Sequence, residues 1–213
     1  FCEKPLAVDV PAAQAFLAAH PAARAAVNFP MASSLAVATL RDWLPGIGTQ
    51  LRVEIDTSFA AWPRSWQRDA ATWLDRPEQG GFTREVVSHF LFLTRRLCGP
   101  MALEQGHASF HTPSASERAI AARITAGALP VTLPVSLWGG VGTTLKDDHN
   151  TWTIWGTKGA IRLRDWSVAE RLTDGAWVPD PAAMPPERMR PLVLRRQLEG
   201  VARMTRGQPH HLA

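Results

Sequence analysis

The sequence predicts an α+β fold in which helices cover one face of a large, mainly antiparallel open sheet. Two patterns predict it. Helical and strand-like segments come first, whereas residues 101–177 show only strand-like runs separated by turn residues. From Leu51 to Phe59, apolar and polar side chains alternate strictly, which is typical of a strand with one buried face. With 213 residues, of which 46% are hydrophobic and 20% charged, the chain can bury a sizeable core.

The first half of the chain is expected to alternate helices with strands. Helix formers after Pro11 predict a first helix that ends near His20. Apolar spacing and turn residues then predict a strand over 25–29, a helix over 32–44, the strand over 51–59 and a helix over 83–98. A tryptophan-rich connection separates the last two, and Gly80-Gly81 precedes the helix over 83–98.

The second half is expected to consist of strands and one final helix. The strands are predicted over 101–111, 118–125, 129–138, 150–155, 159–166 and 168–172. Thr157-Lys158, which lies between two glycines, predicts a tight hairpin. Pro130 and Pro134 lack a backbone N–H, so the run over 129–138 is expected at a sheet edge or as no regular strand. A proline-rich loop over 179–191 leads to a last helix over roughly 187–206.

Composition excludes several classes of protein. No run approaches the ~18 apolar residues of a membrane helix and no signal-type segment is present, so we expect no membrane association and a cytoplasmic location. The formal charge of +4 is concentrated in residues 186–206, which is more typical of a solvated helix face than of a nucleic-acid partner. Cys2 and Cys98 lack CxxC spacing, so no metal site is assigned, while one disulfide between them stays open.

One stripe of the helix over 83–98 carries side chains that could do chemistry. At ~100° per residue, Glu85, His89, Phe92 and Arg96 share this stripe. Glu85, one turn before His89, could orient the imidazole and stabilise its protonated form, giving a general base near neutral pH. The same spacing also occurs on ordinary helix surfaces, so both interpretations stay open on spacing alone.

Four segments follow an order and spacing that are found in one enzyme family. They are Cys2-Glu3-Lys4-Pro5-Leu6-Ala7, Gly46 to Val53, Gly80 to His89 with the helix ending at Gly99, and Trp155 to Leu163. The first resembles the EKP motif of the glucose-fructose oxidoreductase/inositol dehydrogenase (Gfo/Idh/MocA) family. The others are similar to that family's alternating strand, its glycine-rich helix start with an acidic residue four positions before a histidine, and its late hairpin.

The resemblance implies a two-domain enzyme, with an N-terminal Rossmann domain for NAD(P) and a C-terminal α/β domain that shapes the substrate site. Residues 1–20 would then be the end of the nucleotide-binding domain, with the EKP turn and a helix, and residues 21–213 the substrate-binding domain. No GxGxxG occurs in the chain, so NAD or NADP would be bound mainly by a domain absent from it. The chain alone is therefore expected to be inactive.

The resemblance also implies roles for individual residues. Glu3, Lys4 and Pro5 would bind the cofactor, with Lys4 near the nicotinamide ribose and the reacting oxygen of the substrate, where a cation favours an oxyanion. His89 would exchange the hydroxyl proton while hydride moves to or from the nicotinamide, and Glu85 stands where the family has an aspartate. Lys4, Glu85 and His89 are thus the predicted catalytic residues.

Trp66, Arg84 and Phe92 are predicted to contact the substrate. Many relatives have an aspartate where this chain has Phe92, so the substrate is expected to be less hydroxylated, or bound differently, than the usual sugar. We expect a small sugar, polyol or related hydroxy or carbonyl compound, and a homo-oligomer formed through the open sheet. The alternative is a non-enzymatic ligand-binding or oligomerisation domain in which the three catalytic positions are relics.

Overall fold

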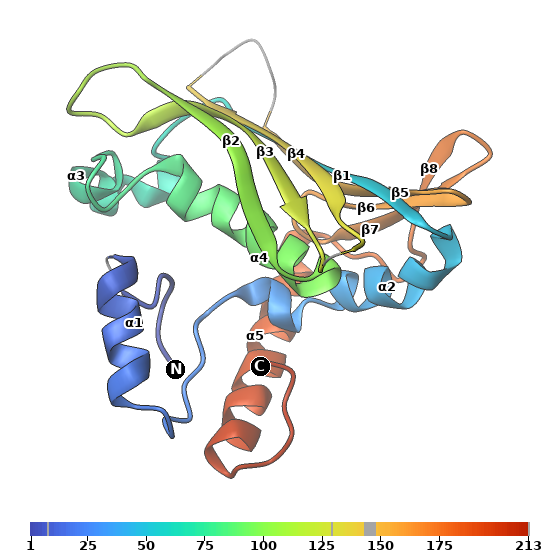
Figure 1. The fold of residues 1–213 in the computed structure, drawn as a ribbon, viewed down its shortest axis with the longest axis horizontal. Coiled ribbons are helices and arrows are strands. Elements are labelled where there is room, and N and C mark those ends of the chain that lie inside the picture. The colour runs from blue at the N-terminus through green and yellow to red at the C-terminus, as the bar shows by residue number, and fades with distance from the viewer. Residues whose placement is uncertain (8, 129, 143–147, 213) are drawn as a thin grey trace.

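The computed structural model of the chain describes residues 1–7, 9–128, 130–142 and 148–212. These residues form an eight-stranded sheet in the order β2-β3-β4-β1-β5-β6-β7-β8, with helices on one side (Figure 1). The strands are β1 (Gln50–Phe59), β2 (Met101–Phe110), β3 (Glu117–Ala126), β4 (Leu133–Val141), β5 (His149–Gly156), β6 (Gly159–Arg164), β7 (Val168–Thr173) and β8 (Ala176–Pro179). All neighbours pair antiparallel except β1 and β4, which are parallel. The predicted α+β class is confirmed.

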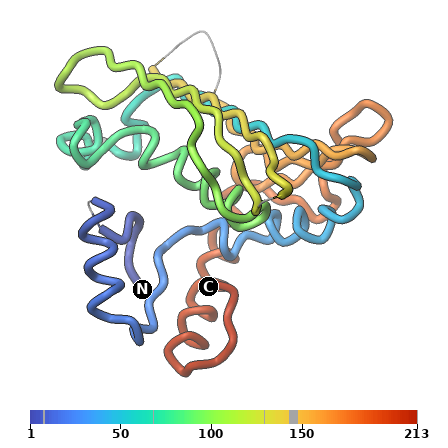
Figure 2. Tube along the Cα trace, in the orientation of Figure 1, coloured from blue at the N-terminus to red at the C-terminus, as the bar shows by residue number. Residues whose placement is uncertain are grey.

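The helices form two groups. Their bounds are α1 (Val10–Ala19), α2 (Leu35–Trp43), α3 (Ala71–Leu74), α4 (Ser88–Cys98) and α5 (Pro186–Thr205), and a π-helical turn, Thr83–Val87, runs directly into α4. Short 3-10 segments lie at Pro30–Ser33, Leu44–Ile47 and Ser65–Ala70. α2 and α4 lie against the sheet, whereas α1 and most of α5 extend away from it (Figures 1 and 2). α1 buries none of its side chains, so it adds nothing to the core.

The core lies between the sheet and the two helices that cover it. The inward-facing residues of β1, such as Val53 and Ile55, are buried as their alternation predicts. Trp152 of β5 is fully buried, and its indole N–H donates to the Thr94 hydroxyl of α4 at 2.9 Å. Because an unpaired buried donor costs about 1–3 kcal/mol, this bond specifies how α4 docks on the sheet.

β4 corrects the prediction that residues 129–138 form a sheet edge or no regular strand. Residue 129 lies outside the described residues, but β4 itself runs through the interior of the sheet between β3 and β1. Pairing with β1 begins only at Val135, which lies opposite Val53. Pro134 precedes this point, so its missing N–H removes no hydrogen bond from the parallel ladder.

Three further segments differ from their predicted form. Residues 25–29 form a single parallel bridge between Val27 and Cys2 instead of a strand. The strand expected over 159–166 ends at Arg164, where a turn begins. β8 is not among the predicted strands, because its four residues are too few to show an alternating pattern in the sequence. Both cysteines are free, so the disulfide left open by the sequence is not formed.

Candidate active site

Lys4 and Glu85 form an ion pair although 81 positions separate them along the chain. The Lys4 ammonium donates to Glu85 Oε1 at 2.9 Å and to the backbone carbonyl of Arg84 at 2.8 Å. The Lys4 side chain is only 9% exposed, so solvent screens this pair less than a surface ion pair. Two of the three ammonium N–H groups are used in these bonds, which leaves one for a ligand.

Contacts with α5 hold the turn that carries Lys4. The Asn28 amide nitrogen donates to both carboxylate oxygens of Glu3, at 3.0 and 3.1 Å, and the Asn28 side-chain oxygen accepts from Gln197 of α5 at 2.7 Å. Glu3 therefore ties the turn to α5 in this structure. Pro5 follows Lys4 through a cis peptide bond and is exposed. That Glu3 and Pro5 bind a cofactor stays a prediction.

The π-helical turn at Thr83–Val87 changes the relation between Glu85 and His89. A spacing of four residues places side chains one above the other only in a regular α-helix, and Glu85 lies in the wider turn. Glu85 accepts from Lys4, and no hydrogen bond joins it to His89 among the described residues. Glu85 thus positions Lys4 instead of orienting the imidazole, which differs from the expectation based on spacing.

A carboxylate from β3 determines where this helical segment begins. Glu117 is only 8% exposed and accepts a hydrogen bond from the backbone N–H of Thr83. Gly81 packs so closely that a Cβ there would stand 2.6 Å from Glu117 Oε2, and its φ of 105° is itself unfavourable for other residues. Glu117 and Gly81 therefore position the helix that carries Glu85 and His89, a role that the sequence pattern does not reveal.

His89 lies between two aromatic rings. Phe29 and Trp166 meet its ring nearly edge-on, at centroid distances of 5.6 and 5.7 Å. Burial, followed by the positive charges of Lys4 and Arg64, lowers the pKa of His89 from 6.5 to about 4. The imidazole is therefore neutral at pH 7, and its pKa lies below the range near neutral pH that the spacing with Glu85 suggested. The side chain as a whole is partly exposed, and its nitrogens have no hydrogen-bond partner among the described residues.

Trp166 reaches His89 because of the turn between β6 and β7. Asp165 and Trp166 both have positive φ, 47° and 67°, as a type I′ turn requires. The buried Asn150 holds this turn, since its backbone carbonyl accepts from the Asp165 N–H at 3.0 Å and its side-chain oxygen from the Trp166 N–H at 2.9 Å. The sequence does not indicate this contact, because Trp166 lies at the end of a predicted strand.

Phe92 continues the aromatic surface beside His89. Its ring stacks on Phe29 with a centroid distance of 4.4 Å and an interplanar angle of 1°. Both rings are partly exposed. The structure therefore brings Phe92 next to the candidate site, and its contact with a substrate stays a prediction.

The other two residues predicted to contact substrate have different surroundings. The Arg84 guanidinium donates to the backbone carbonyl of Gln79 at 2.7 Å and so closes the preceding loop, while only its own carbonyl reaches Lys4. Trp66 is 70% exposed, and the guanidinium of Arg64 lies 4.8 Å from its ring centroid. In the described part of the chain, Trp66 is thus connected to the candidate site only by its contact with Arg64. The Arg84 side chain is bound to the preceding loop instead.

Arg64 is a site residue that the sequence analysis missed. It lies in the tryptophan-rich connection between β1 and α3, and its charge acts on both His89 and Glu85. Its position between Trp62 and Trp66 is the one signal in the sequence that could have drawn attention to it, because arginine commonly stacks on aromatic rings. No periodic pattern places it near residue 89.

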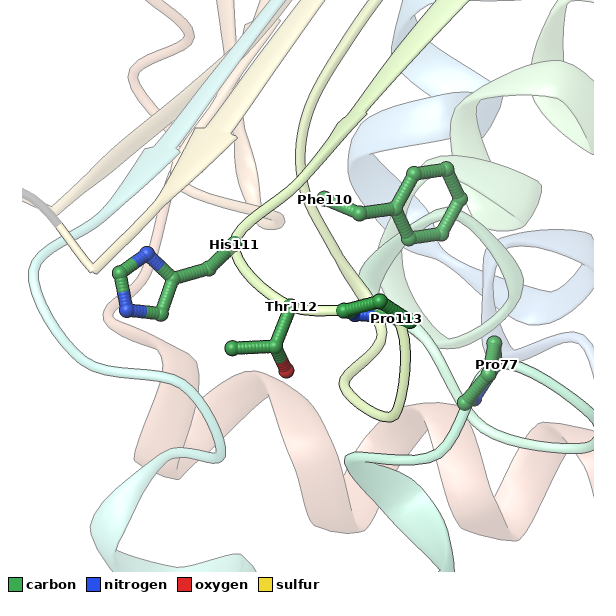
Figure 3. A pocket seen from close by; sticks show the side chains of 5 residues that line it. All are labelled: Pro77, Phe110, His111, Thr112 and Pro113. Atoms are coloured by element: carbon green, nitrogen blue, oxygen red, sulfur yellow. The ribbon is translucent and has the colours of Figure 1, made fainter.

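One surface depression is lined by none of these residues. It has a volume of about 450 Å³ and is lined by Pro77, Phe110, His111, Thr112 and Pro113, at the loop that joins β2 to β3 (Figure 3). Phe110 and His111 point to opposite sides of the chain (Figure 3). The depression therefore lacks the converging polar groups that a catalytic site needs.

Two further features are absent from the described residues: a candidate metal site and a membrane-spanning helix. Within the described ranges, no group of three or more His, Cys, Asp or Glu side chains is placed to hold a metal ion. No helix in the same part of the chain is long and apolar enough to cross a bilayer.

The sheet and its covering helices have the fold of the C-terminal domain of Gfo/Idh/MocA-type oxidoreductases. No family model and no curated protein matches the sequence. Among solved structures, an oxidoreductase from Agrobacterium radiobacter in complex with NAD+, L-tartaric acid and magnesium matches with a TM-score of 0.72 at 17% identity. The 3-ketoreductase KijD10 from Actinomadura kijaniata, in complex with NADP and TDP-benzene, matches with a TM-score of 0.73 at 14% identity.

A third similar structure is the super-repressor mutant of Gal80p from Saccharomyces cerevisiae, with a TM-score of 0.73 at 12% identity. Each match covers 99% of this chain, but only 64%, 64% and 60% of the respective neighbours. The chain thus spans less than two thirds of the length of these proteins. At such identities the likeness establishes the fold, and the fold predicted from the resemblance is confirmed.

Proposed function

We propose that this chain is the substrate-binding and catalytic portion of an NAD(P)-dependent oxidoreductase that acts on a small hydroxy or carbonyl compound. The observation that carries the proposal is the proximity of Lys4 and His89. Lys4 bonds to the carbonyl of Arg84 and to Glu85, at the start of the helix that bears His89, and its charge lowers the pKa of His89. A fixed cation beside a neutral, accessible imidazole is the pair that alcohol oxidation requires.

In this proposal His89 moves the proton. The neutral imidazole accepts the hydroxyl proton as the alcohol becomes a carbonyl, and returns it in the reverse direction. Lys4 binds the same oxygen through its remaining N–H and stabilises negative charge on it. Glu85 keeps Lys4 in place and balances its charge, so a glutamate serves here where the family has an aspartate.

The residues present fit the nicotinamide end of a dinucleotide cofactor, but they include no motif that would bind its pyrophosphate. With the remaining Lys4 N–H on the reacting oxygen, the flanking Glu3 and Pro5 would border the nicotinamide ribose, whereas none of the 213 residues forms a GxGxxG. The nicotinamide would accept or donate the hydride. We assign residues 1–20 to the end of a nucleotide-binding domain, because α1 buries none of its side chains in the described part of the chain.

The open face of the sheet is the proposed surface for a homo-oligomer. Helices lie on the other side (Figure 1), and Trp138 of β4, which alternates with the buried Val135 and Leu137, is 42% exposed. Large exposed aromatic residues on an otherwise polar face are typical of subunit interfaces. Analytical ultracentrifugation of the chain, with Trp138→Lys as the variant, tests this assignment, and a monomeric wild-type chain would contradict it.

The proposed activity has a direct test. The coding DNA upstream of Phe1 should encode a strand-GxGxxG-helix unit, and the protein comprising both parts should form NAD(P)H from a hydroxy substrate. Lys4→Met and His89→Gln should each lower kcat by about 10²–10⁴-fold. Lys158→Met and His107→Gln, at exposed positions outside the site, are the matched controls and should leave kcat unchanged.

Two outcomes would reject the oxidoreductase in favour of a non-enzymatic ligand-binding domain. One is an upstream sequence without a dinucleotide-binding unit. The other is a protein that binds small hydroxy compounds equally well after Lys4→Met and His89→Gln and forms no NAD(P)H.

A further inference from the structure

Arg64 is held in a fixed orientation at the edge of the candidate site. Gln67, which is 6% exposed, accepts from both the backbone N–H and the side-chain Nε of Arg64, at 3.2 and 3.1 Å. The guanidinium carbon lies 5.3 Å from the Phe59 ring centroid and 4.8 Å from that of Trp66. Both rings and Gln67 restrict the side chain, so its two terminal nitrogens are presented in one direction.

Within the described ranges, those terminal nitrogens have no protein partner. In the same part of the chain, Arg64 makes no salt bridge. Its hydrogen bonds there use the backbone N–H and Nε, and neither terminal nitrogen donates one. Arg64 is partly exposed, so a ligand can approach its side chain. A partly desolvated arginine that forms no direct ion pair is unfavourable, and an incoming anion could pair with it.

Two carboxylates, Glu85 and Asp148, act on the charge of Arg64, but neither forms an ion pair with it among the described residues. Glu85 is already bonded to Lys4, and Asp148 accepts a hydrogen bond from the backbone N–H of Ala60 at 2.7 Å. Arg190 of α5 adds a further positive charge on the same side. Lys4, Arg64 and Arg190 together exceed Glu85 and Asp148 by one positive charge, so with His89 neutral the site favours an anion.

The other wall of the site is apolar. Phe29 stacks on Phe92, and Phe29 also meets the His89 ring edge-on. Hydroxyl groups of a sugar or polyol placed against these rings would lose hydrogen bonds to water without replacement. An aromatic or alkyl group would instead gain from burial and stacking.

We propose that the substrate is a 2-hydroxy acid with an apolar body, or the corresponding 2-keto acid. Its carboxylate binds the two terminal nitrogens of Arg64 in a bidentate fork, and its apolar body lies on Phe29 and Phe92. The carbinol group is then held between Lys4 and His89. This inference rests on the proposed function, which it narrows from hydroxy compounds in general to carboxylates.

The reaction is balanced by the partners already named. In oxidation the carbinol C–H bond breaks and its electron pair moves as hydride to NAD(P)+. The O–H bond breaks, its proton goes to His89, and the C–O bond becomes a carbonyl. The carboxylate on Arg64 takes no part in electron transfer and serves to orient the carbinol carbon.

Four probes separate the contributions of charge and apolar body. They are 3-phenyllactate, its uncharged analogue 3-phenyl-1,2-propanediol, lactate, and 1,2-propanediol, each titrated into the chain with binding followed by ligand-observed NMR. We expect 3-phenyllactate to bind at least about tenfold more tightly than either the diol that lacks its charge or the acid that lacks its ring. Equal affinity for 3-phenyllactate and 3-phenyl-1,2-propanediol would overturn the proposal.

Variants of Arg64 test whether this residue causes the tighter binding of 3-phenyllactate. Arg64→Met should remove the advantage of 3-phenyllactate over the diol, and Arg64→Lys should retain part of it because the charge remains. Arg95→Met removes one exposed positive charge from α4 and should change nothing. Binding of 3-phenyllactate that is unchanged in Arg64→Met would contradict the assignment.

The same probes distinguish this inference from the proposed function. Arg64-dependent binding of 3-phenyllactate, without oxidation by the protein that comprises both domains, would leave the carboxylate site standing and reject the oxidoreductase. Oxidation of neutral polyols with kcat/KM unchanged in Arg64→Met would support the oxidoreductase and reject the carboxylate site.

Discussion

His89 should make this protein less stable as the pH falls. In the folded chain burial and the charges of Lys4 and Arg64 lower the pKa of His89 to about 4, whereas in the unfolded chain it titrates near 6.5. Above the unfolded pKa both states are neutral and His89 has no effect. As the pH falls through about 6.5 the unfolded state takes up the proton first, so folding stability is lost down to the folded pKa.

The size of the effect follows from the two pKa values. Between about pH 7.5 and pH 5 the loss from His89 alone is about 2 kcal/mol, and it approaches about 3 kcal/mol below pH 4. Urea unfolding followed by tryptophan fluorescence measures it in wild type and in His89→Gln. The variant cannot take up this proton, so the free energy of unfolding of wild type should fall by about 2 kcal/mol more over that range.

The difference between the two proteins isolates His89, because the carboxylates titrate in both. Lys4→Met serves as a second variant: removal of the neighbouring cation should raise the pKa of His89, as followed by the imidazole Cε1–H resonance in NMR. If wild type and His89→Gln lose the same stability, or if the imidazole titrates at or above 6.5, the buried, neutral histidine described here is refuted.

Two sets of substitutions and one labelling experiment test the packing of the chain. Thr94→Val leaves the buried Trp152 indole N–H without its acceptor and should lower the free energy of unfolding by about 1–3 kcal/mol in urea titrations. Gly156→Ala places a Cβ 2.3 Å from a backbone carbonyl and should cost about 1–3 kcal/mol, whereas Gly46→Ala, with no atom within 4 Å, should not destabilise; equal melting temperatures would contradict this. Burial raises the pKa of Cys98 to about 11, so iodoacetamide at about pH 8 should label it far more slowly than the exposed cysteine, as peptide mass spectrometry would show.

Most secondary structure could be predicted from the sequence because it depends on local periodicity. The alternation in β1 and the apolar face of α4 both correspond to buried surfaces in the structure. Pro134 misled the prediction for β4, since a proline is excluded only where its N–H would be needed, and this depends on which neighbour pairs beside it. The position of β4 in the sheet is a property of long-range pairing, which one strand's sequence does not contain.

The candidate catalytic residues come from the resemblance and stay a prediction, whereas their interactions come only from the structure. Lys4, Glu85 and His89 were selected by resemblance, and the structure brings Lys4 to the helix that bears His89. The helical spacing of Glu85 and His89 suggested the wrong pairing, because the π-helical turn and the arrival of Lys4 from the N-terminal turn both redirect Glu85. Arg64 could not be located at all, since nothing in its local sequence specifies what packs against it.

The sequence by itself determined the fold class, the order of helices and strands, and the residue types available for proton transfer, because these follow from composition and from periods of two and 3.6 residues. Only the tertiary structure decided that Lys4 binds Glu85, that Trp166 and Phe29 enclose His89, and that the imidazole is neutral. Burial and charge at a side chain are set by neighbours distant in sequence, and these are known only once the chain has folded.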